Sequence, residues 1–397
     1  MLIAVCHKMP LSGISESRSR KPIIMMRALV LAAAASAAIL EPIGYDREGS
    51  ALAYLTNAGV EATAADVADL NKDAPSLVAM LAMATDAPEQ LADLIKASPM
   101  SVIADEVVDM PAAGAGAAAL PVVVAHGMGD SCYNSGMKSI TEAAGKKLNA
   151  YATCVPTAEG WLFDTIDGFL KNMDKSVDFF AAKIRADPKL AGGFNAFGFS
   201  QGNNVIRGYI TKYNDPPVKN FMSICGINAG VGAFPQCSPE IPVVGPTVCK
   251  GLAEVLGDLA YNKLVQDILF QANYYRDPAK TSDASYLKNS RLAQWNGEGE
   301  VNATYVANWA KTDNFIWVEG TLDTVVWPRQ GEQWGAMDPK DPWKTVLPMN
   351  ETDWYTKDSF GLKTADEAGK NHFESFVGEH IRMTDAQLMG WLEKYFA

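Results

Sequence analysis

The pattern of hydrophobic and polar residues changes at about residue 119. Before that point, Ala-rich stretches carry apolar residues at helical spacing, for example over 77–84 and 91–97, which predicts a small helical extension over residues 41–118. The extension ends in an Ala- and Gly-rich linker at 111–119. We interpret its stripe of Met and Leu side chains as a packing face, with a lipid-binding surface as the alternative. The role of the extension in the mature protein stays open, including its removal as a pro-segment.

From residue 119 onward, short apolar runs alternate with helical patterns, which is typical of a largely parallel sheet covered by helices. The expected strands are 121–127, 194–200, 219–226, 314–320 and 372–378. One long amphipathic helix is expected over 165–186, and another helix over 203–213. No strand pattern occurs between about residues 227 and 311, where we expect a helical cap inserted over the active site. The fold class expected for 119–397 is therefore α/β.

Composition narrows the classes of function. The 397 residues carry a formal net charge of -12, and the isoelectric point is about 4.9. Because phosphate binding needs a basic face, this acidity excludes nucleic acid as a partner. A hydrophobic share of 48% supports a sizeable buried core. An acidic globular enzyme fits these values.

A candidate targeting segment occupies residues 1–40. The apolar run at 26–38 follows the basic stretch SRSRK at 17–21 and ends in small residues, as a secretory signal peptide does. The run is too short to span a bilayer comfortably, although a membrane anchor or a buried helix is the alternative. We therefore expect a mature protein in the secretory pathway, lysosomal or secreted, without a stable membrane span.

Cysteine usage agrees with an oxidising compartment. Of the six cysteines, Cys237 and Cys249 bracket a Pro-rich loop, and a bridge across so short a loop would contribute about 3 kcal/mol. A zinc site has little support, because the chain has four histidines and no CxxC pair. We expect neither a metal nor a cofactor. Two sequons, at Asn302 and Asn350, are compatible with glycosylation of exposed loops.

The pentapeptide GFSQG at 198–202 follows an expected strand and opens an expected helix, which is the context of a nucleophile elbow. Such an elbow holds its serine in a strained backbone conformation, and glycines leave room on both sides of the turn. The pentapeptide alone arises by chance fairly often. Its position between a strand and a helix makes Ser200 the candidate nucleophile of a serine hydrolase.

A serine hydroxyl needs a base to take its proton, and the chain offers four histidines. His7 belongs to the targeting segment, and His126 ends the first strand, where we expect it to shape a loop. His372 starts the last strand, which suggests a structural role. His380 lies just beyond that strand, at the carboxyl edge where parallel sheets bind ligands, so it is the candidate general base.

The base needs an acidic partner that fixes its tautomer. Asp323 follows the strand 314–320 and would lie at the same edge of the sheet, whereas Glu319 lies on the strand and Asp313 precedes it. A plain turn aspartate is the alternative explanation for Asp323. The order Ser200, Asp323, His380 matches that of the α/β-hydrolase fold.

The tetrahedral oxyanion of such a reaction needs hydrogen-bond donors. The backbone N–H of Gln201, next after the nucleophile, and that of Met128, in the loop after the first strand, are the candidates for this oxyanion hole.

Several separated motifs resemble one family, the palmitoyl-protein thioesterases, and in particular its lysosomal type 1 branch. The motifs are HGMGDSC at 126–132, DPKLAGGFNAFGFSQG at 187–202, QANYYRDP at 271–278, YTKDSFGLK at 355–363 and GEH at 378–380. The resemblance implies an α/β-hydrolase fold and removal of palmitate-like groups from cysteines of S-acylated proteins in the lysosome. It places the catalytic triad on Ser200, Asp323 and His380, and the oxyanion donors on Met128 and Gln201. The segment after Gly226 would form most of the acyl groove.

The sequence also departs from that family. Tyr133 follows Cys132 where the family has a second cysteine, and Asn203 follows GFSQG where the family has a glycine. Cys237 and Cys249 match a family disulfide. Because Cys132 and Cys154 follow neighbouring expected strands, we offer a bridge between them as a hypothesis, and the pairing of Cys225 stays open.

Two other functions compete with the thioesterase. A lipase or carboxylesterase would use the same triad on oxygen esters, and the motifs beyond the triad argue against it. A non-catalytic lipid-binding protein on a hydrolase scaffold would not need all three triad residues.

Overall fold

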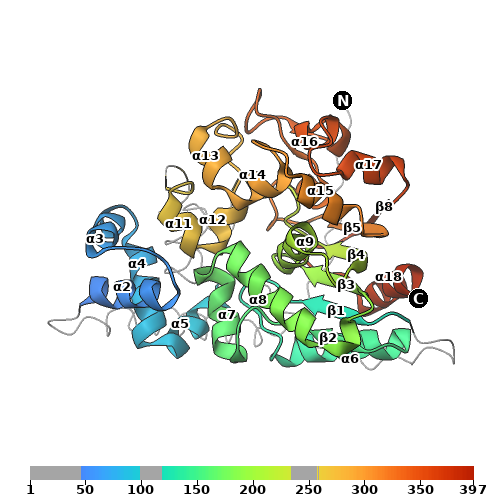
Figure 1. The fold of residues 1–397 in the computed structure, drawn as a ribbon, viewed down its shortest axis with the longest axis horizontal. Coiled ribbons are helices and arrows are strands. Elements are labelled where there is room, and N and C mark those ends of the chain that lie inside the picture. Colours follow the sequence, from blue (N-terminus) through green and yellow to red (C-terminus); the bar gives the residue numbers. More distant parts are fainter. Residues whose placement is uncertain (1–45, 99–118, 234–256, 258) are drawn as a thin grey trace, which may run out of the picture. The chain divides into compact units, whose positions relative to one another are not determined.

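The central feature of the fold is a six-stranded sheet in which all neighbouring strands are parallel. The computed structural model describes residues 46–98, 119–233, 257 and 259–397 (Figure 1). The strand order is β2-β1-β3-β4-β5-β8. The strands are β1 Val122–Ala125, β2 Ala152–Cys154, β3 Phe194–Phe199, β4 Val218–Ile224, β5 Asn314–Gly320 and β8 Asn371–Phe376. The expected α/β class and the five expected strands are confirmed, and β2 adds an edge strand.

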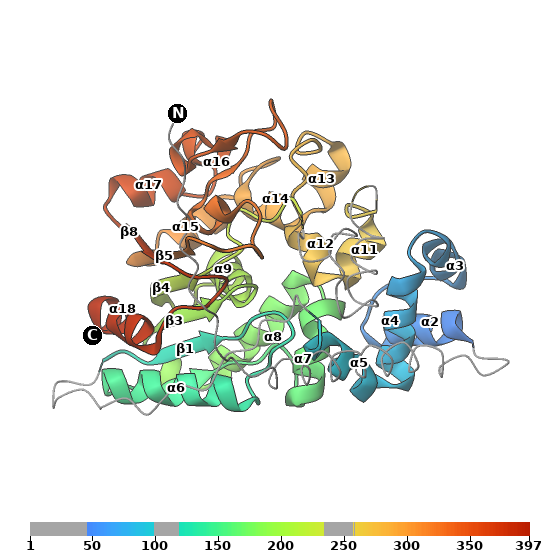
Figure 2. The same ribbon diagram turned by 180° about the vertical axis from the view of Figure 1, so that it is seen from behind.

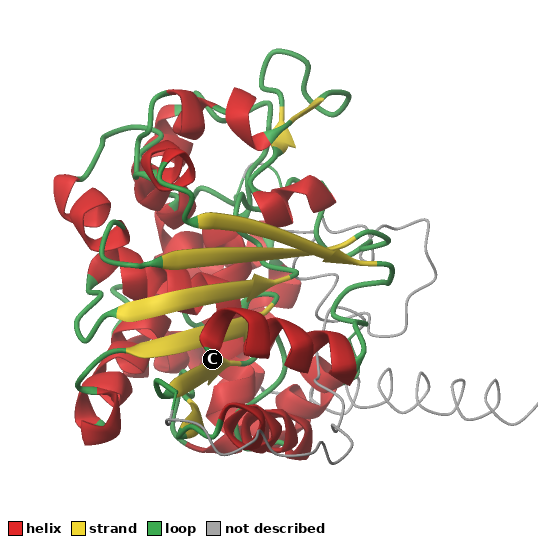
Figure 3. Cartoon of the chain, turned by 90° about the vertical axis from the view of Figure 1, so that its right-hand side faces the viewer, coloured by secondary structure: helices red, strands yellow, loops and turns green. Residues whose placement is uncertain are grey.

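Helices cover both faces of this sheet (Figure 3). The helices in the first and last parts of the domain are α6 Ser135–Leu148, α7 Gly160–Leu170, α8 Met173–Ala186, α9 Gly202–Lys212, α17 Leu362–Glu367 and α18 Asp385–Phe396. One face buries Val122 and Val124 against α6 and α18. On β5, Phe315 stacks on Trp309 with 4.2 Å between ring centroids. Strands buried on both faces are apolar without interruption, which explains why their runs were visible in the sequence.

The prediction of one continuous helix over 165–186 is wrong. The structure has two helices, because Lys171 and Asn172 are extended and helical geometry resumes at Met173. The side chain of Asn172 caps α8 by accepting a hydrogen bond from the backbone N–H of Lys175, at 2.9 Å. The N–H of Met173 is held from outside the segment, since it donates to Asn273 Oδ1 at 2.7 Å.

The described part of the chain between β4 and β5 contains five short helices joined by turns and loops. These helices are α11 Lys263–Ile268, α12 Phe270–Tyr274, α13 Ala284–Asn289, α14 Arg291–Asn296 and α15 Ala303–Trp309. After β5 come the 3₁₀ helix η3 Arg329–Gln333, the antiparallel pair β6 Ala336–Met337 and β7 Val346–Leu347, the 3₁₀ helix η4 Met349–Glu351, and α16 Asp353–Thr356.

The N-terminal extension is helical in its described part, as expected. Its helices are α2 Arg47–Asn57, α3 Ala64–Asp73, α4 Pro75–Asp86 and α5 Pro88–Lys96. The apolar side chains of α4 are buried, including Leu77, Met80 and Leu81, so the stripe is a packing face. The extension lies beside α7 in both views (Figures 1 and 2), and the hydroxyl of Tyr54 donates to the carbonyl of Leu170 at 3.1 Å.

Several sequence predictions fall outside the described residues. These are the targeting segment 1–40, most of the linker 111–119, and the Cys237/Cys249 loop. Within the part of the chain that the structure describes, no helix is both long and apolar enough to cross a membrane.

Candidate active site

Ser200 occupies a sharp turn between β3 and α9. Its φ is 50°, a left-handed conformation that is uncommon for residues other than glycine. A Cβ on Gly202 would lie 2.4 Å from the carbonyl oxygen of His126, and one on Gly198 would lie 2.7 Å from Asn203 Oδ1. Both positions therefore need glycine, because the chain passes too closely for any side chain. This is the elbow geometry that the sequence predicts.

Asn203, the residue that departs from the family pattern, stabilises this turn through its side chain. Its side-chain amide donates to the carbonyl of Ser200 at 3.1 Å and to that of Ile224 at 2.9 Å. The N–H of Ser200 also donates to Ile224, at 3.0 Å. Two of these hydrogen bonds tie the elbow to the end of the neighbouring strand β4, and the third lies within the elbow. A glycine at position 203 could supply none of the side-chain bonds.

The structure brings Asp323 and His380 together at the carboxyl edge of the sheet. Asp323 Oδ2 is hydrogen-bonded to His380 Nδ1, and both side chains are buried. Asp323 Oδ1 accepts from the backbone N–H groups of Val325 at 2.7 Å and Val326 at 3.0 Å. Burial acts to raise the pKa of Asp323, but the hydrogen bond and the charge of His380 outweigh it and hold that pKa below its ordinary value.

The other ring nitrogen of His380 is open. Nε2 is buried, and no described residue gives it a hydrogen-bond partner. Ser200 follows the end of β3, and His380 follows the end of β8, with β4 and β5 between these two strands. Since carboxyl ends of parallel strands meet at one edge, the serine and the histidine share the edge where such sheets bind ligands.

Met128 and Gln201, the predicted oxyanion residues, are joined through helix α12. Gln271 Nε2 donates to Gln201 Oε1 at 2.9 Å and lies 3.0 Å from the Met128 sulfur. The hydroxyl of Tyr274 also donates to Gln201 Oε1, at 3.1 Å. The sequence reasoning assigned no role to Gln271 or Tyr274, although both lie in the QANYYRDP motif. These contacts fix the loop after β1 and the start of α9 to the chain between β4 and β5.

The two other described histidines have structural contacts. His126 Nε2 lies 3.1 Å from Asp164 Oδ1, and its Nδ1 lies 2.9 Å from the carbonyl oxygen of Gly127. His372 Nε2 lies 3.0 Å from Asn314 Oδ1, at the start of β5 and so at the amino edge of the sheet. Both positions agree with the roles that the sequence indicates.

The predicted bridge between Cys132 and Cys154 is present, which confirms that hypothesis. It links the loop after β1 to the end of β2. Both predicted glycosylation positions, Asn302 and Asn350, are exposed. Asn302 also caps α15, since its Oδ1 accepts from the N–H of Thr304 at 2.9 Å.

One buried cluster of polar side chains was missed by the sequence reasoning. It contains Cys225, Asp323, Glu332 and His380, whose sulfur, oxygen and nitrogen atoms lie within 4.8 Å of one another. Such a set could in principle approach a cation, but Asp323 and His380 already bond to each other, and the Cys225 thiol accepts from the N–H of Ile381 at 3.3 Å. We therefore interpret it as a hydrogen-bonded acid–base cluster. A second group, around His126 and Asp164, has its only sulfur in the disulfide.

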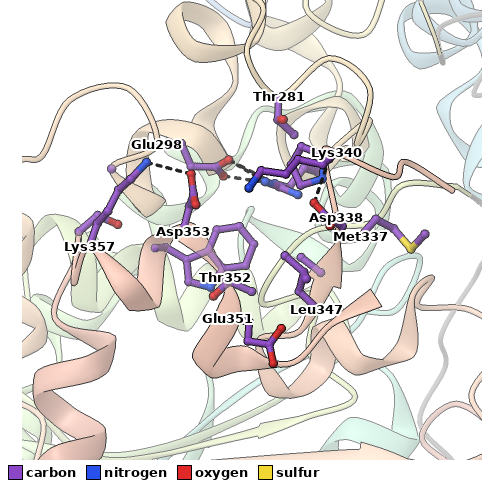
Figure 4. Close-up of a pocket in the computed structure, with 16 residues that line it drawn as sticks. Thr281, Glu298, Met337, Asp338, Lys340, Leu347, Glu351, Thr352, Asp353 and Lys357 are labelled. Atoms are coloured by element: carbon purple, nitrogen blue, oxygen red, sulfur yellow. Dashed lines mark hydrogen bonds and ion pairs between the residues drawn. The ribbon is translucent and has the colours of Figure 1, made fainter. Parts of the chain in front are cut away.

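A pocket of about 370 Å³ lies elsewhere, between the chain around α14 and the segment after β6 (Figure 4). None of the predicted site residues lines it. Four of its charged side chains form ion pairs: Arg276 with Glu298 at 3.0 Å, and Lys357 with Asp353 at 2.8 Å.

Comparison with known proteins identifies the family. The model of the palmitoyl protein thioesterases matches residues 121–380. The chain belongs to the palmitoyl-protein thioesterase family. Among its relatives, palmitoyl-protein thioesterase 1 of Caenorhabditis elegans is 34% identical over 282 residues, which are 70% of this chain and 92% of that protein.

Two further relatives extend the comparison. Palmitoyl-protein thioesterase 3 of Dictyostelium discoideum is 32% identical over 232 residues, which are 58% of this chain and 75% of the relative. Lysosomal thioesterase PPT2 of Homo sapiens is 28% identical over 253 residues, which are 62% of this chain and 76% of the relative. Each of these relatives matches only part of this member of the palmitoyl-protein thioesterase family.

Proposed function

We propose that this enzyme hydrolyses fatty-acyl thioesters and removes palmitate-like groups from protein cysteines. Ser200 is the nucleophile, His380 the general base, and Asp323 the carboxylate that orients it. The observation that supports this assignment most is the asymmetry of His380, whose Nδ1 is held by Asp323 while its Nε2 is buried and open. A base that must accept a proton from a serine needs one such free nitrogen.

The reaction proceeds through an acyl-enzyme. Ser200 Oγ attacks the thioester carbonyl while His380 Nε2 takes the hydroxyl proton, and the backbone N–H groups of Met128 and Gln201 bind the oxyanion. Collapse of this intermediate breaks the carbon–sulfur bond, and His380 returns the proton to the leaving thiolate. Water, deprotonated by the same nitrogen, then cleaves the acyl-serine to the free fatty acid and restores the hydroxyl.

We further propose that the insertion at about 227–311 forms the cap and lines the acyl groove of the 119–397 domain. Gln271 and Tyr274 support this, because they attach the insertion to both oxyanion residues. Burial of the acyl chain would contribute about 0.8 kcal/mol per methylene. The helical extension 41–118 is a separate region that precedes the 119–397 domain.

We propose that the enzyme works in the secretory pathway, in the lysosome or outside the cell. The Cys132–Cys154 disulfide supports an oxidising compartment, and one relative is named a lysosomal thioesterase. Fractionation of expressing cells, combined with endoglycosidase treatment of the Asn302→Gln and Asn350→Gln variants, tests this. Exclusive recovery from the cytosol without glycan would contradict it.

The decisive experiment compares hydrolysis of an S-palmitoylated peptide, palmitoyl-CoA and a matched oxygen ester by the wild type and Ser200→Ala. We expect the wild type to prefer the thioesters and Ser200→Ala to be inactive. Mass spectrometry of the wild type should find the trapped acyl group on the peptide that contains Ser200. Ser176→Ala is the matched control, since Ser176 is a buried serine of α8. Activity that survives in Ser200→Ala would refute the mechanism, and preference for the oxygen ester would favour a lipase.

A further inference from the structure

Glu332 is a buried acid close to the proposed triad. It lies in η3, after β5, and is 0% exposed. Its Oε2 accepts a hydrogen bond from the N–H of Gly320 at 3.0 Å, and its carbonyl accepts from Asn228 Nδ2 at 2.7 Å. The position of the side chain is therefore set by the end of β5 and by the chain after β4. Its second oxygen, Oε1, is buried and has no hydrogen-bond partner in the described part of the chain.

The carboxyl group of Glu332 lies beside that of Asp323. One oxygen of each belongs to the cluster whose atoms all lie within 4.8 Å of one another, and each carboxyl group shifts the pKa of the other. Two ionised carboxylates have no proton to share and would repel each other in a buried site. This repulsion favours a proton on one of the pair.

The proton belongs on Glu332 rather than on Asp323. Asp323 also accepts two backbone hydrogen bonds and faces His380, and these partners favour its charged form. Glu332 has one N–H donor and one unpaired buried oxygen. Burial and the nearby Asp323 charge raise the pKa of Glu332 well above its ordinary value.

We propose that Glu332 is a neutral carboxylic acid whose O–H donates a hydrogen bond to Asp323 and so positions that carboxylate against His380 Nδ1. This inference rests on the proposed function, since it assigns a positioning residue to the same triad. Glu332 itself contacts no reacting atom. A buried acid that is kept neutral so that it can donate a hydrogen bond is an established device in enzyme sites.

The titratable groups that face Glu332 are Asp323, Cys225, Glu319 and His380, and of these the carboxyl groups of Asp323 and Glu319 favour its neutral form. Glu319 is paired with Arg329 at 3.2 Å, so its charge is partly compensated. Burial, followed by the neighbouring carboxyl groups, raises the pKa of the Cys225 thiol well above its ordinary value, so that thiol adds no charge at neutral pH. Ionisation of Glu332 would thus add a second negative charge beside Asp323.

The test compares Glu332→Gln, Glu332→Leu and the control Glu319→Gln. Gln keeps an N–H donor toward Asp323, so we expect kcat within about threefold of the wild type. Leu removes the donor, and we expect kcat to fall roughly 10- to 100-fold with little change in KM, the usual cost of losing a group that orients another. Glu319→Gln should leave kcat unchanged. Equal losses in the Gln and Leu variants, or full activity in the Leu variant, would overturn the proposal.

A second measurement does not depend on turnover. Infrared spectra at pH 7 should show a neutral carboxylic acid in the wild type and in Ser200→Ala, and this band should be missing from Glu332→Gln. A wild-type spectrum without the band would overturn the proposal even if the Leu variant fails to fold. Activity surviving in Ser200→Ala would refute the proposed function, while the band would still report the state of Glu332.

Discussion

The enzyme contains two buried histidine–aspartate pairs that differ in one respect. His126 with Asp164 lies after β1, and His380 with Asp323 lies at the ends of β8 and β5. In the first pair both ring nitrogens have partners, whereas in the second pair Nε2 is open. The same two residue types thus build a structural element in one region and a candidate base in the other.

The aspartate of the first pair also joins two loops. The carboxylate of Asp164 accepts from the Ser131 hydroxyl at 2.9 Å and from the N–H groups of Cys132 at 2.9 Å and Thr157 at 2.7 Å, besides His126. It therefore ties together the loops after β1 and β2. Burial lowers the pKa of His126, but the attraction of Asp164 outweighs this and raises it to about 9, so the ring stays charged at neutral pH. A cation without a free lone pair cannot accept a proton from a serine.

The largest expected effect separates the two histidines by activity. His380→Ala should lower kcat/KM by about 10⁵, as loss of a triad base does, with little change in the free energy of unfolding. His126→Ala should instead lower the free energy of unfolding and reduce activity far less, measured on the folded fraction. Kinetics together with urea denaturation check both. A larger kinetic loss in His126→Ala would reverse the assignment of the two pairs.

The two aspartates should differ in the same sense. Asp164→Ala leaves a buried cation and several donors without an acceptor, which should cost about 3–5 kcal/mol in the free energy of unfolding. Asp323→Asn keeps the side-chain shape and should mainly lower kcat, by about 10⁴. Denaturation midpoints and kcat of both variants give the comparison. If Asp323→Asn were the more destabilised protein, the second pair would be structural as well.

The fold was predictable where local pattern and burial agree. Strands buried on both faces leave uninterrupted apolar runs such as 122–125, and these runs predicted the strands of the sheet. The break between α7 and α8 was not predictable, because apolar periodicity continues through it. That break depends on Asn172 and on Asn273, a residue about one hundred positions further along the chain.

The same distinction applies to the site. Ser200, Asp323 and His380 each follow a strand, so chain order and the parallel sheet were enough to group them. Glu332 lies in a polar stretch without periodicity, and its environment is created by residues that follow β4, β5 and β8. Its burial and its neighbours become visible only once the sheet edge is assembled.

The charge of His126 gives a pH dependence of stability. Its folded-state pKa of about 9 exceeds the unfolded value of about 6.5, so its contribution is fully present below pH 6.5 and is lost as the pH rises through 9. The upper limit of this contribution is roughly 3 kcal/mol. Urea denaturation of the wild type and His126→Gln between pH 6 and 10 measures it. Curves that stay parallel over this range would show that folding does not raise the pKa of His126.

The smallest expected effect concerns His372, the histidine at the opposite edge of the sheet. It makes one hydrogen bond, to Asn314 Oδ1, and its ring packs 5.2 Å from that of Tyr395. His372→Ala should therefore cost about 1 kcal/mol in the free energy of unfolding and leave kcat/KM unchanged within about twofold. In a double-mutant cycle with Asn314→Ala, which also removes a bond to Asn220 Oδ1 at 2.7 Å, the double variant should lose less than the sum of the single losses, because both changes remove the bond between His372 and Asn314. A fall in kcat/KM by orders of magnitude in His372→Ala would contradict this expectation. It would mean that the catalytic histidine is not distinguished by an open ring nitrogen at the carboxyl edge of the sheet.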